Sequence, residues 1–143
     1  KIKMIYGKYE TVNSYKKPFI DWLPHPLAII INFFGIPKKF DIIKYSKKIK
    51  KKVTFEKLEL AFYFNYLKIF VEFSNYLKVP TKKIIFYNKK QNEIYNGYCR
   101  KNQKTVKLLL EKFYNKNKIN DISSNLKVYE LLFKIENRLS KKN

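Results

Sequence analysis

Residues 58–78 read LELAFYFNYLKIFVEFSNYLK, and the fold depends on how this stretch is interpreted. Its polar residues recur at intervals of three, four and three, which places them on one stripe of a helix. They are Asn65, Lys68, Glu72 and Asn75. The rest of the circumference is mostly apolar, so such a helix must be covered on more than one side. The spacing predicts a helix over 58–78, covered by a small sheet and by a partner.

The beginning of the same stretch also fits a strand. Leu58, Leu60, Phe62 and Phe64 alternate with other residues, and an alternation of period two is typical of a strand with one buried face. A strand therefore remains an alternative for the first part of the stretch. At the far end, Pro80 is expected to stop the helix, because the residue before a proline avoids the helical region.

Upstream, residues 47–55 read KKIKKKVTF. Ile49, Val53 and Phe55 fit one face of a half-buried strand, and lysines fill the other positions. Without a counter-charge these lysines would repel one another, so contact with RNA phosphates is favoured over a merely solvated face. The expected RNA-binding residues in this run are Lys47, Lys48, Lys50, Lys51 and Lys52.

Downstream, residues 83–88 have the composition of a strand, and Asn96-Gly97 indicates a turn. Basic residues are interleaved here with tyrosines, a combination that suits single-stranded or looped RNA, although an ordinary loop is the alternative. The expected RNA-binding residues are Lys82, Lys83, Lys89, Lys90, Arg100 and Lys101. Residues 105–114 fit either a strand or a helix. Residues 126–139 predict a second amphipathic helix.

From residue 46 the expected order is strand, helix, strand, strand, helix. This order predicts an α+β fold, a ferredoxin-like split βαβ domain over residues 47–143 whose last strand is missing. The vacant sheet position would be an open edge, or would be filled from the preceding segment or from another chain.

Residues 1–46 hold four of the five prolines and are expected to form an irregular N-terminal extension. Their longest apolar run, LAIIINFFGI at 27–36, is about half the roughly 20 residues that a membrane-spanning helix needs. We read this run as an anchor that packs either as ordinary core on the chain's own domain, the favoured reading, or on a neighbouring protein. The extension as a whole is expected to dock on neighbours. The expected docking residues are Trp22, Ile30, Phe33 and Phe34.

The composition limits the partners and the chemistry. The 143 residues include 32 Lys+Arg against 11 Asp+Glu, a net charge of +21, which predicts an anionic partner. A genome rich in A and T would favour lysine codons, but it would raise neutral asparagine equally. Because lysine is a point charge for phosphate, contacts with the RNA backbone are expected rather than reading of bases. One Cys and one His make a metal site improbable, and no catalytic group, cofactor or small-molecule substrate is expected.

A family resemblance adds to this reading. Val79-Pro80-Thr81-Lys82-Lys83 resembles the segment that opens a strand in the small-subunit ribosomal protein ten family, and residues 120–132 are similar to the approach to that family's second helix. Residues 107–111 and Gly7-Lys8-Tyr9 look closer to a paralogue of the same fold, large-subunit protein forty-eight of mitochondrial ribosomes. The resemblance covers roughly residues 50–139.

The resemblance implies a structural component of the mitochondrial ribosome, located in the matrix, with a slight preference for the large-subunit paralogue. Its partners would be ribosomal RNA and other ribosomal proteins, and the chain would be neither an enzyme nor membrane-spanning. The alternative is an accessory subunit of a membrane-bound respiratory complex, in which basic and aromatic surfaces would meet protein and anionic lipid.

Overall fold

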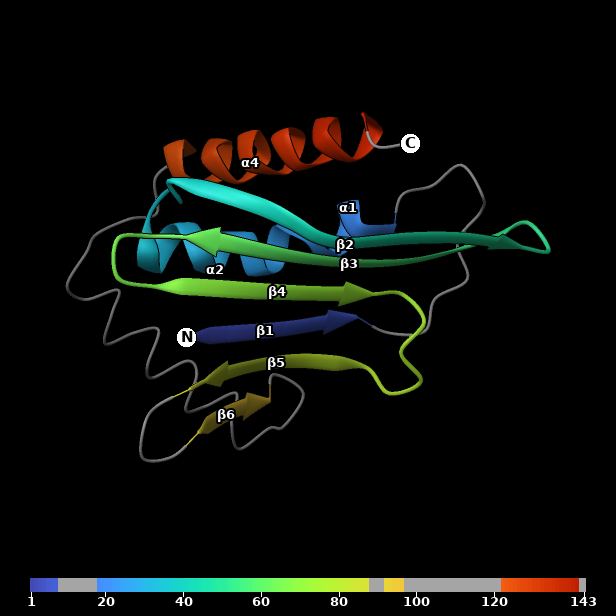
Figure 1. Ribbon diagram of the computed structural model, residues 1–143, viewed down its shortest axis with the longest axis horizontal. Coiled ribbons are helices and arrows are strands. Elements are labelled where there is room, and N and C mark those ends of the chain that lie inside the picture. The colour runs from blue at the N-terminus through green and yellow to red at the C-terminus, as the bar shows by residue number, and fades with distance from the viewer. Residues whose placement is uncertain (8–17, 88–91, 97–121, 142–143) are drawn as a thin grey trace.

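The computed structural model describes residues 1–7, 18–87, 92–96 and 122–141. In these ranges helices cover one face of a mixed sheet (Figure 1), so the predicted α+β class is confirmed. The elements in chain order are β1 (Ile2–Gly7), α1 (Pro18–Trp22), α2 (Pro24–Phe34), β2 (Lys39–Lys50), β3 (Val53–Tyr63), β4 (Lys68–Ser74), β5 (Thr81–Phe86), β6 (Glu93–Asn96) and α4 (Ile122–Ser140). None of the described helices has the length and apolarity needed to cross a bilayer.

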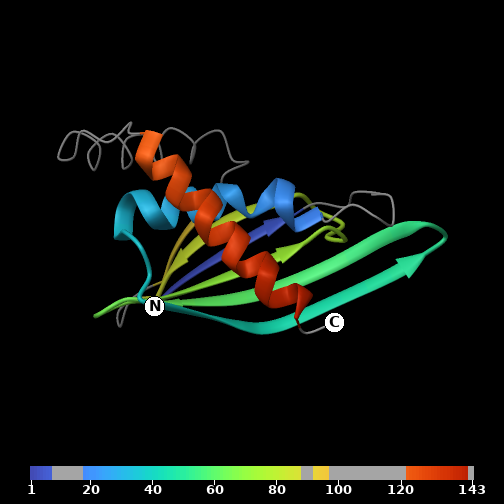
Figure 2. The same cartoon turned by 90° about the horizontal axis from the view of Figure 1, so that it is seen from above.

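The sheet has the strand order β2-β3-β4-β1-β5-β6. Strands β2, β3 and β4 form an antiparallel meander, and β5 and β6 form a hairpin. Between them lies β1, parallel to β4 and antiparallel to β5. The N-terminal strand thus joins the two halves of the sheet. All three described helices lie on the same side, above the sheet in Figure 2, and the other side is called the open face below.

The prediction of a helix over 58–78 is wrong. The alternative, a strand indicated by the alternation at the beginning of this stretch, is correct. Leu58, Leu60 and Phe62 of β3 are fully buried on the helix-covered face. After a turn closed by the hydrogen bond from the Phe64 N–H to the Leu67 carbonyl (2.9 Å), β4 continues with a second alternating set. The polar residues that fit a helical stripe lie in the β3–β4 turn, in β4 and just after it, so their helical spacing is accidental. Two alternating runs prevail because each strand then has one buried face.

The strand boundaries and the ferredoxin-like arrangement differ from expectation. Residues 47–55 span the end of β2, a turn at 51–52 and the beginning of β3. From residue 46 on, four strands follow one another with no described helix between them, so the ferredoxin-like arrangement is not confirmed. The strand expected at 83–88 is confirmed in type and runs from Thr81 to Phe86.

The domain boundary predicted after residue 46 is also wrong, because it falls inside β2. The described part of residues 1–46 belongs to the same layered unit and supplies a central strand and two helices. Its prolines are compatible with helices because Pro18 and Pro24 stand at the first helical positions, where a missing N–H costs no internal hydrogen bond.

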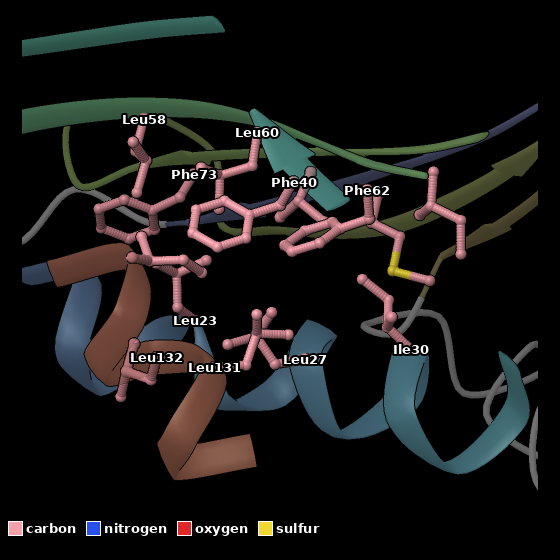
Figure 3. Close-up of a cluster of buried hydrophobic side chains, with 14 of the residues drawn as sticks. Leu23, Leu27, Ile30, Phe40, Leu58, Leu60, Phe62, Phe73, Leu131 and Leu132 are labelled. Atoms are coloured by element: carbon pink, nitrogen blue, oxygen red, sulfur yellow. The ribbon is translucent and has the colours of Figure 1, made fainter. Parts of the chain in front are cut away.

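The core lies between the sheet and the helices (Figure 3). Leu23 and Leu27 point from the helix layer toward side chains of β2, β3 and β4, among them Phe40 and Phe62. Helix α4 contributes a buried stripe of Val128, Leu131, Leu132 and Ile135, which confirms the amphipathic helix predicted at 126–139.

Arg138 connects the end of α4 to the edge strand β2. Its Nη1 donates a 2.7 Å hydrogen bond to the Phe40 carbonyl, and its guanidinium lies 4.2 Å from the Phe40 ring centre. A guanidinium can make both contacts at once because it is planar and carries several donors. The contact occupies a backbone acceptor on a strand that has a neighbour on one side only.

Candidate nucleic-acid interface

The β2–β3 hairpin extends past the other strands at the right of Figure 1. Lys51 and Lys52 form its two-residue turn, with φ values of 48° and 63°. Two successive residues at positive φ are typical of a type I′ turn, which matches the twist of the strands but favours Asn-Gly. Each lysine therefore occupies a left-handed conformation that costs about 1–2 kcal/mol relative to a right-handed one.

The lysines predicted to bind RNA gather at the tip of this hairpin. Residues 47, 48, 50, 51 and 52 are all exposed, and Lys44 continues the series along β2. None of these lysines forms an ion pair with a carboxylate in the described part of the chain. Within the described ranges the tip is thus a concentration of positive charge that no carboxylate pairs with. We call residues 47–52 the lysine tip.

Beside the lysine tip the open face is hollowed. The hollow has a volume of about 610 Å³ and is lined by Lys44, Ser46, Lys48, Lys50, Phe55, Lys57 and Tyr76. In the strand register Ser46 lies opposite Lys57, Lys48 opposite Phe55 and Lys50 opposite Val53. Lysines of β2 therefore form one wall of the hollow, and two aromatic rings form part of the other. The Phe55 and Tyr76 ring centres are 6.4 Å apart and their planes meet at 71°.

Buried hydrogen bonds hold the aromatic wall in place. The Asn75 side chain accepts a 2.7 Å bond from the Glu56 N–H through Oδ1 and donates a 2.8 Å bond to the Thr54 carbonyl through Nδ2. The Asn75 N–H donates to the Glu56 carbonyl at 3.2 Å. These bonds attach the chain beyond β4 to β3, which fixes Tyr76 beside Phe55. Buried polar groups paired in this way are costly to disturb.

On the helix-covered side of the hairpin, Tyr45 and Glu56 join the two strands. The Tyr45 hydroxyl donates a 2.8 Å hydrogen bond to Glu56 Oε1. Burial, and secondly this bond to a carboxylate, raise the pKa of Tyr45 above its ordinary value. The hydroxyl therefore stays protonated and continues to donate in neutral solution.

Lys57 differs from the other lysines of the hollow because its charge is compensated. Its Nζ lies 2.9 Å from Glu59 Oε1 and 3.2 Å from Glu72 Oε1, and Lys3 pairs with Glu72 at 2.8 Å. The hydrogen bond to Glu59 is the main cause of a raised pKa for Lys57. Partial burial alone would raise the pKa of Glu72, but hydrogen bonds from Lys3 and Lys57 outweigh it and lower that pKa. The positive excess of the hollow is therefore on the β2 side.

The other predicted RNA-binding residues do not join this cluster. Lys82 and Lys83 lie on β5, which is separated from β3 by β4 and β1, and they point to opposite faces of the sheet. Lys82 Nζ lies 5.9 Å from the centre of the Trp22 ring. Lys89, Lys90, Arg100 and Lys101 fall outside the described residues, as does the segment 105–114.

The residues predicted to dock on neighbouring proteins belong at least partly to this chain's own core. Ile30 has no exposed surface and packs in the core between α2 and the sheet, so the prediction that it docks on another protein is wrong. Trp22 and Phe34 are half-buried against the same core. Phe33 is half-buried and meets Phe34 edge-on, with 6.4 Å between the ring centres. The apolar run therefore packs as ordinary core, as one of its two readings predicted.

Sequence reasoning missed five of the seven residues that line the hollow: Lys44, Ser46, Phe55, Lys57 and Tyr76. Alternation along residues 44–50, continued through the hairpin, would have placed Lys44 and Ser46 with Lys48 on one face. Tyr76 falls at the end of the helix predicted over 58–78, so its position can be found only once β4 is recognised as a strand. No metal-binding group of three His, Cys, Asp or Glu side chains occurs within the described ranges.

Compared with models of known protein families, with curated proteins and with solved structures, the chain matches none. The candidate interface therefore rests on the chain's own geometry and charge.

Proposed function

We propose that this protein is a structural RNA-binding component of a ribonucleoprotein particle and that its β2–β3 hairpin contacts the phosphate backbone. One observation carries the proposal: a projecting hairpin places five exposed lysines together without a described acidic partner. Two of these lysines occupy turn positions at which Asn-Gly would be less strained.

Local physics disfavours this arrangement unless a polyanion is bound. Adjacent lysines repel one another, and the left-handed turn adds backbone strain. Codon bias does not account for Lys51, because asparagine has equally AT-rich codons and fits the turn better. Strain that persists at an exposed site is a reason to infer function there. Phosphates along a nucleic-acid strand would supply the missing counter-charges.

More specifically, we propose that the particle is the mitochondrial ribosome, in the matrix, with ribosomal RNA and other ribosomal proteins as partners and without enzymatic activity. The net charge of +21 and the resemblance of residues 79–83 and 120–132 to the ribosomal protein ten family support this proposal. A ferredoxin-like arrangement is not needed for it, since phosphate contacts require only the exposed lysine tip.

The RNA contact is tested by measuring binding of a labelled RNA to the full chain at several salt concentrations. The substitution Lys51→Asn combined with Lys52→Gly removes two charges from the tip and retains the turn. If these lysines contact phosphates, the slope of log affinity against log salt falls in magnitude by about 2, about 1 for each lysine. Affinity drops for all RNA sequences alike.

A matched variant shows whether RNA binding depends on where the two charges are removed or only on the total charge. Lys127→Gln combined with Lys134→Gln also removes two charges, but from exposed positions on α4. We expect this variant to keep nearly the full salt slope. Equal effects of the two double substitutions would show that only net charge matters and would reject the hairpin as the contact.

The assignment to a ribosome is tested by sedimentation of a mitochondrial extract through a magnesium-containing gradient. Comigration with one ribosomal subunit is the expected result. Migration with detergent-solubilised inner-membrane complexes, free of ribosomal RNA, would instead support the respiratory-complex alternative.

A further inference from the structure

We propose that the hollow beside the lysine tip binds one unpaired nucleotide, with its base against Phe55 and Tyr76 and its phosphates against Lys44, Lys48 and Lys50. This inference rests on the proposed RNA contact and names the form of RNA that the site takes. It implies that the protein prefers single-stranded or looped RNA to a duplex.

The two rings suit a single base. Phe55 is half-buried and Tyr76 is 41% exposed, so both retain accessible surface on the open face. Because their planes meet at 71° with 6.4 Å between centres, the rings do not stack on each other. A base lying flat on one ring would meet the other ring edge-on, and both arrangements are favourable between aromatic groups.

The charges give the ligand a direction. Lys44, Lys48 and Lys50 on the β2 side have no ion pair with a described carboxylate. On the other side Lys57 is held by Glu59 and Glu72, whose charges would repel a phosphate. An anionic group is therefore attracted to β2, and an uncharged aromatic group fits the opposite wall. A nucleotide has both parts, an anionic phosphate and an uncharged aromatic base, whereas a peptide that is only acidic would leave the rings unused.

The size and rigidity of the hollow also fit a nucleotide. Its volume of about 610 Å³ lies within the range of about 300–1,000 Å³ that is typical of small-ligand sites. Tyr76 is positioned by the buried hydrogen bonds of Asn75 and by a 3.3 Å bond from its own N–H to Ser74 Oγ. A site held in place before binding loses less conformational entropy when the ligand arrives.

A duplex could not use the aromatic wall. Bases in a helix are already stacked on their neighbours and expose only their edges, so protein aromatic rings stack on unpaired bases. A duplex would still be attracted by the lysine tip through its phosphates. The two parts of the interface therefore predict different responses to substitution.

The test compares a labelled oligouridine of about ten nucleotides with a duplex of the same length, each titrated with the full chain. We expect Phe55→Leu and Tyr76→Leu each to weaken binding of the single strand about tenfold. Duplex affinity and the salt slope should stay unchanged, because the lysines remain. Tyr66→Leu is the control, since Tyr66 is a fully exposed aromatic in the β3–β4 turn; it should change neither affinity.

A second measurement uses the unsubstituted protein, so that it does not depend on the folding of variants. An oligonucleotide with 4-thiouridine is photo-crosslinked to the chain and the adduct is mapped by mass spectrometry. Crosslinks at Phe55 or Tyr76 support the proposal. Crosslinks confined to other residues, or leucine variants that bind the single strand normally, overturn it.

The outcomes distinguish the two proposals. If neither RNA binds in a salt-dependent manner, the RNA-binding function itself fails. If both RNAs bind through the lysine tip but the aromatic substitutions have no effect on the single strand, only the nucleotide site fails. Equal losses for the single strand and the duplex would likewise reject the nucleotide site, since a duplex cannot stack on these rings.

Discussion

Gly7 shows how one residue at the end of β1 permits the central strand to pair. Its φ is 149°, and a Cβ added there would lie 1.8 Å from the carbonyl oxygen of Ser74 on the adjacent strand β4. The close approach of two backbones leaves no space for a side chain. At this position glycine is required by both the backbone conformation and the contact.

We therefore expect Gly7→Ala to lower the free energy of unfolding by about 2–3 kcal/mol, because either the Ser74 peptide or β1 must move. Urea denaturation measures the change. The control is Gly35→Ala, at φ 79° and ψ −165° with nothing within 4 Å of an added Cβ. It should cost less than Gly7→Ala, because backbone strain of about 1–3 kcal/mol is its only penalty. Equal costs for the two substitutions would contradict the steric argument.

At the scale of an element, the turn of the β2–β3 hairpin lowers the stability of the fold while it supplies charges for RNA binding. Its turn residues Lys51 and Lys52 are held at positive φ, where Asn-Gly is preferred. We expect the Asn-Gly replacement to raise the free energy of unfolding by about 1 kcal/mol, through relief of strain. The increase is measured as a higher urea midpoint with an unchanged slope. The same variant binds RNA more weakly, so the two effects have opposite signs; a variant that loses both stability and binding would contradict this account.

Sequence patterns predicted some elements better than others. The buried stripe of α4 follows from its own spacing, because α4 packs with one face only. For residues 58–78, the two periodicities compete, and only the pairing of β3 with both β2 and β4 decides between them. The position of β1 could not be predicted, since its neighbours β4 and β5 lie more than sixty residues away in the chain.

Across the whole molecule, an ion-pair cluster on the open face ties three strands together. Lys3 of β1 pairs with Glu72 of β4, and Glu72 also pairs with Lys57 of β3. Lys57 in turn pairs with Glu59 of the same strand, and the N–O distances are 2.8–3.2 Å. β1 lies more than sixty residues before β4 in the chain, so the Lys3–Glu72 pair exists only in the folded state. Its stabilisation is modest because water screens the charges.

The lowered pKa of Glu72 gives this cluster a pH dependence. A carboxyl whose pKa is lower when folded contributes stability above its ordinary value of 4.5, and loses it as the pH falls through the folded pKa. We expect Glu72→Gln to cost up to about 1 kcal/mol at neutral pH and almost nothing in strong acid, where Glu72 is itself neutral. Urea denaturation at several pH values checks this; a cost independent of pH would show that charge is not the cause.

The amino-acid sequence by itself determined the chemistry of this protein: the excess of lysine, the run at 47–52, the α+β composition and the amphipathic helix near the C-terminus. Each of these is a property of neighbouring residues. Only the tertiary structure decided that residues 58–78 are two strands, that β1 is central and that Ile30 is core.

The tertiary structure also brought Tyr76 beside Phe55 and set the lysines of β2 against both. The physical reason is that strand pairing joins residues through long-range hydrogen bonds and shared burial. These contacts reward one global arrangement of the chain, and no local window of sequence contains both Phe55 and Tyr76.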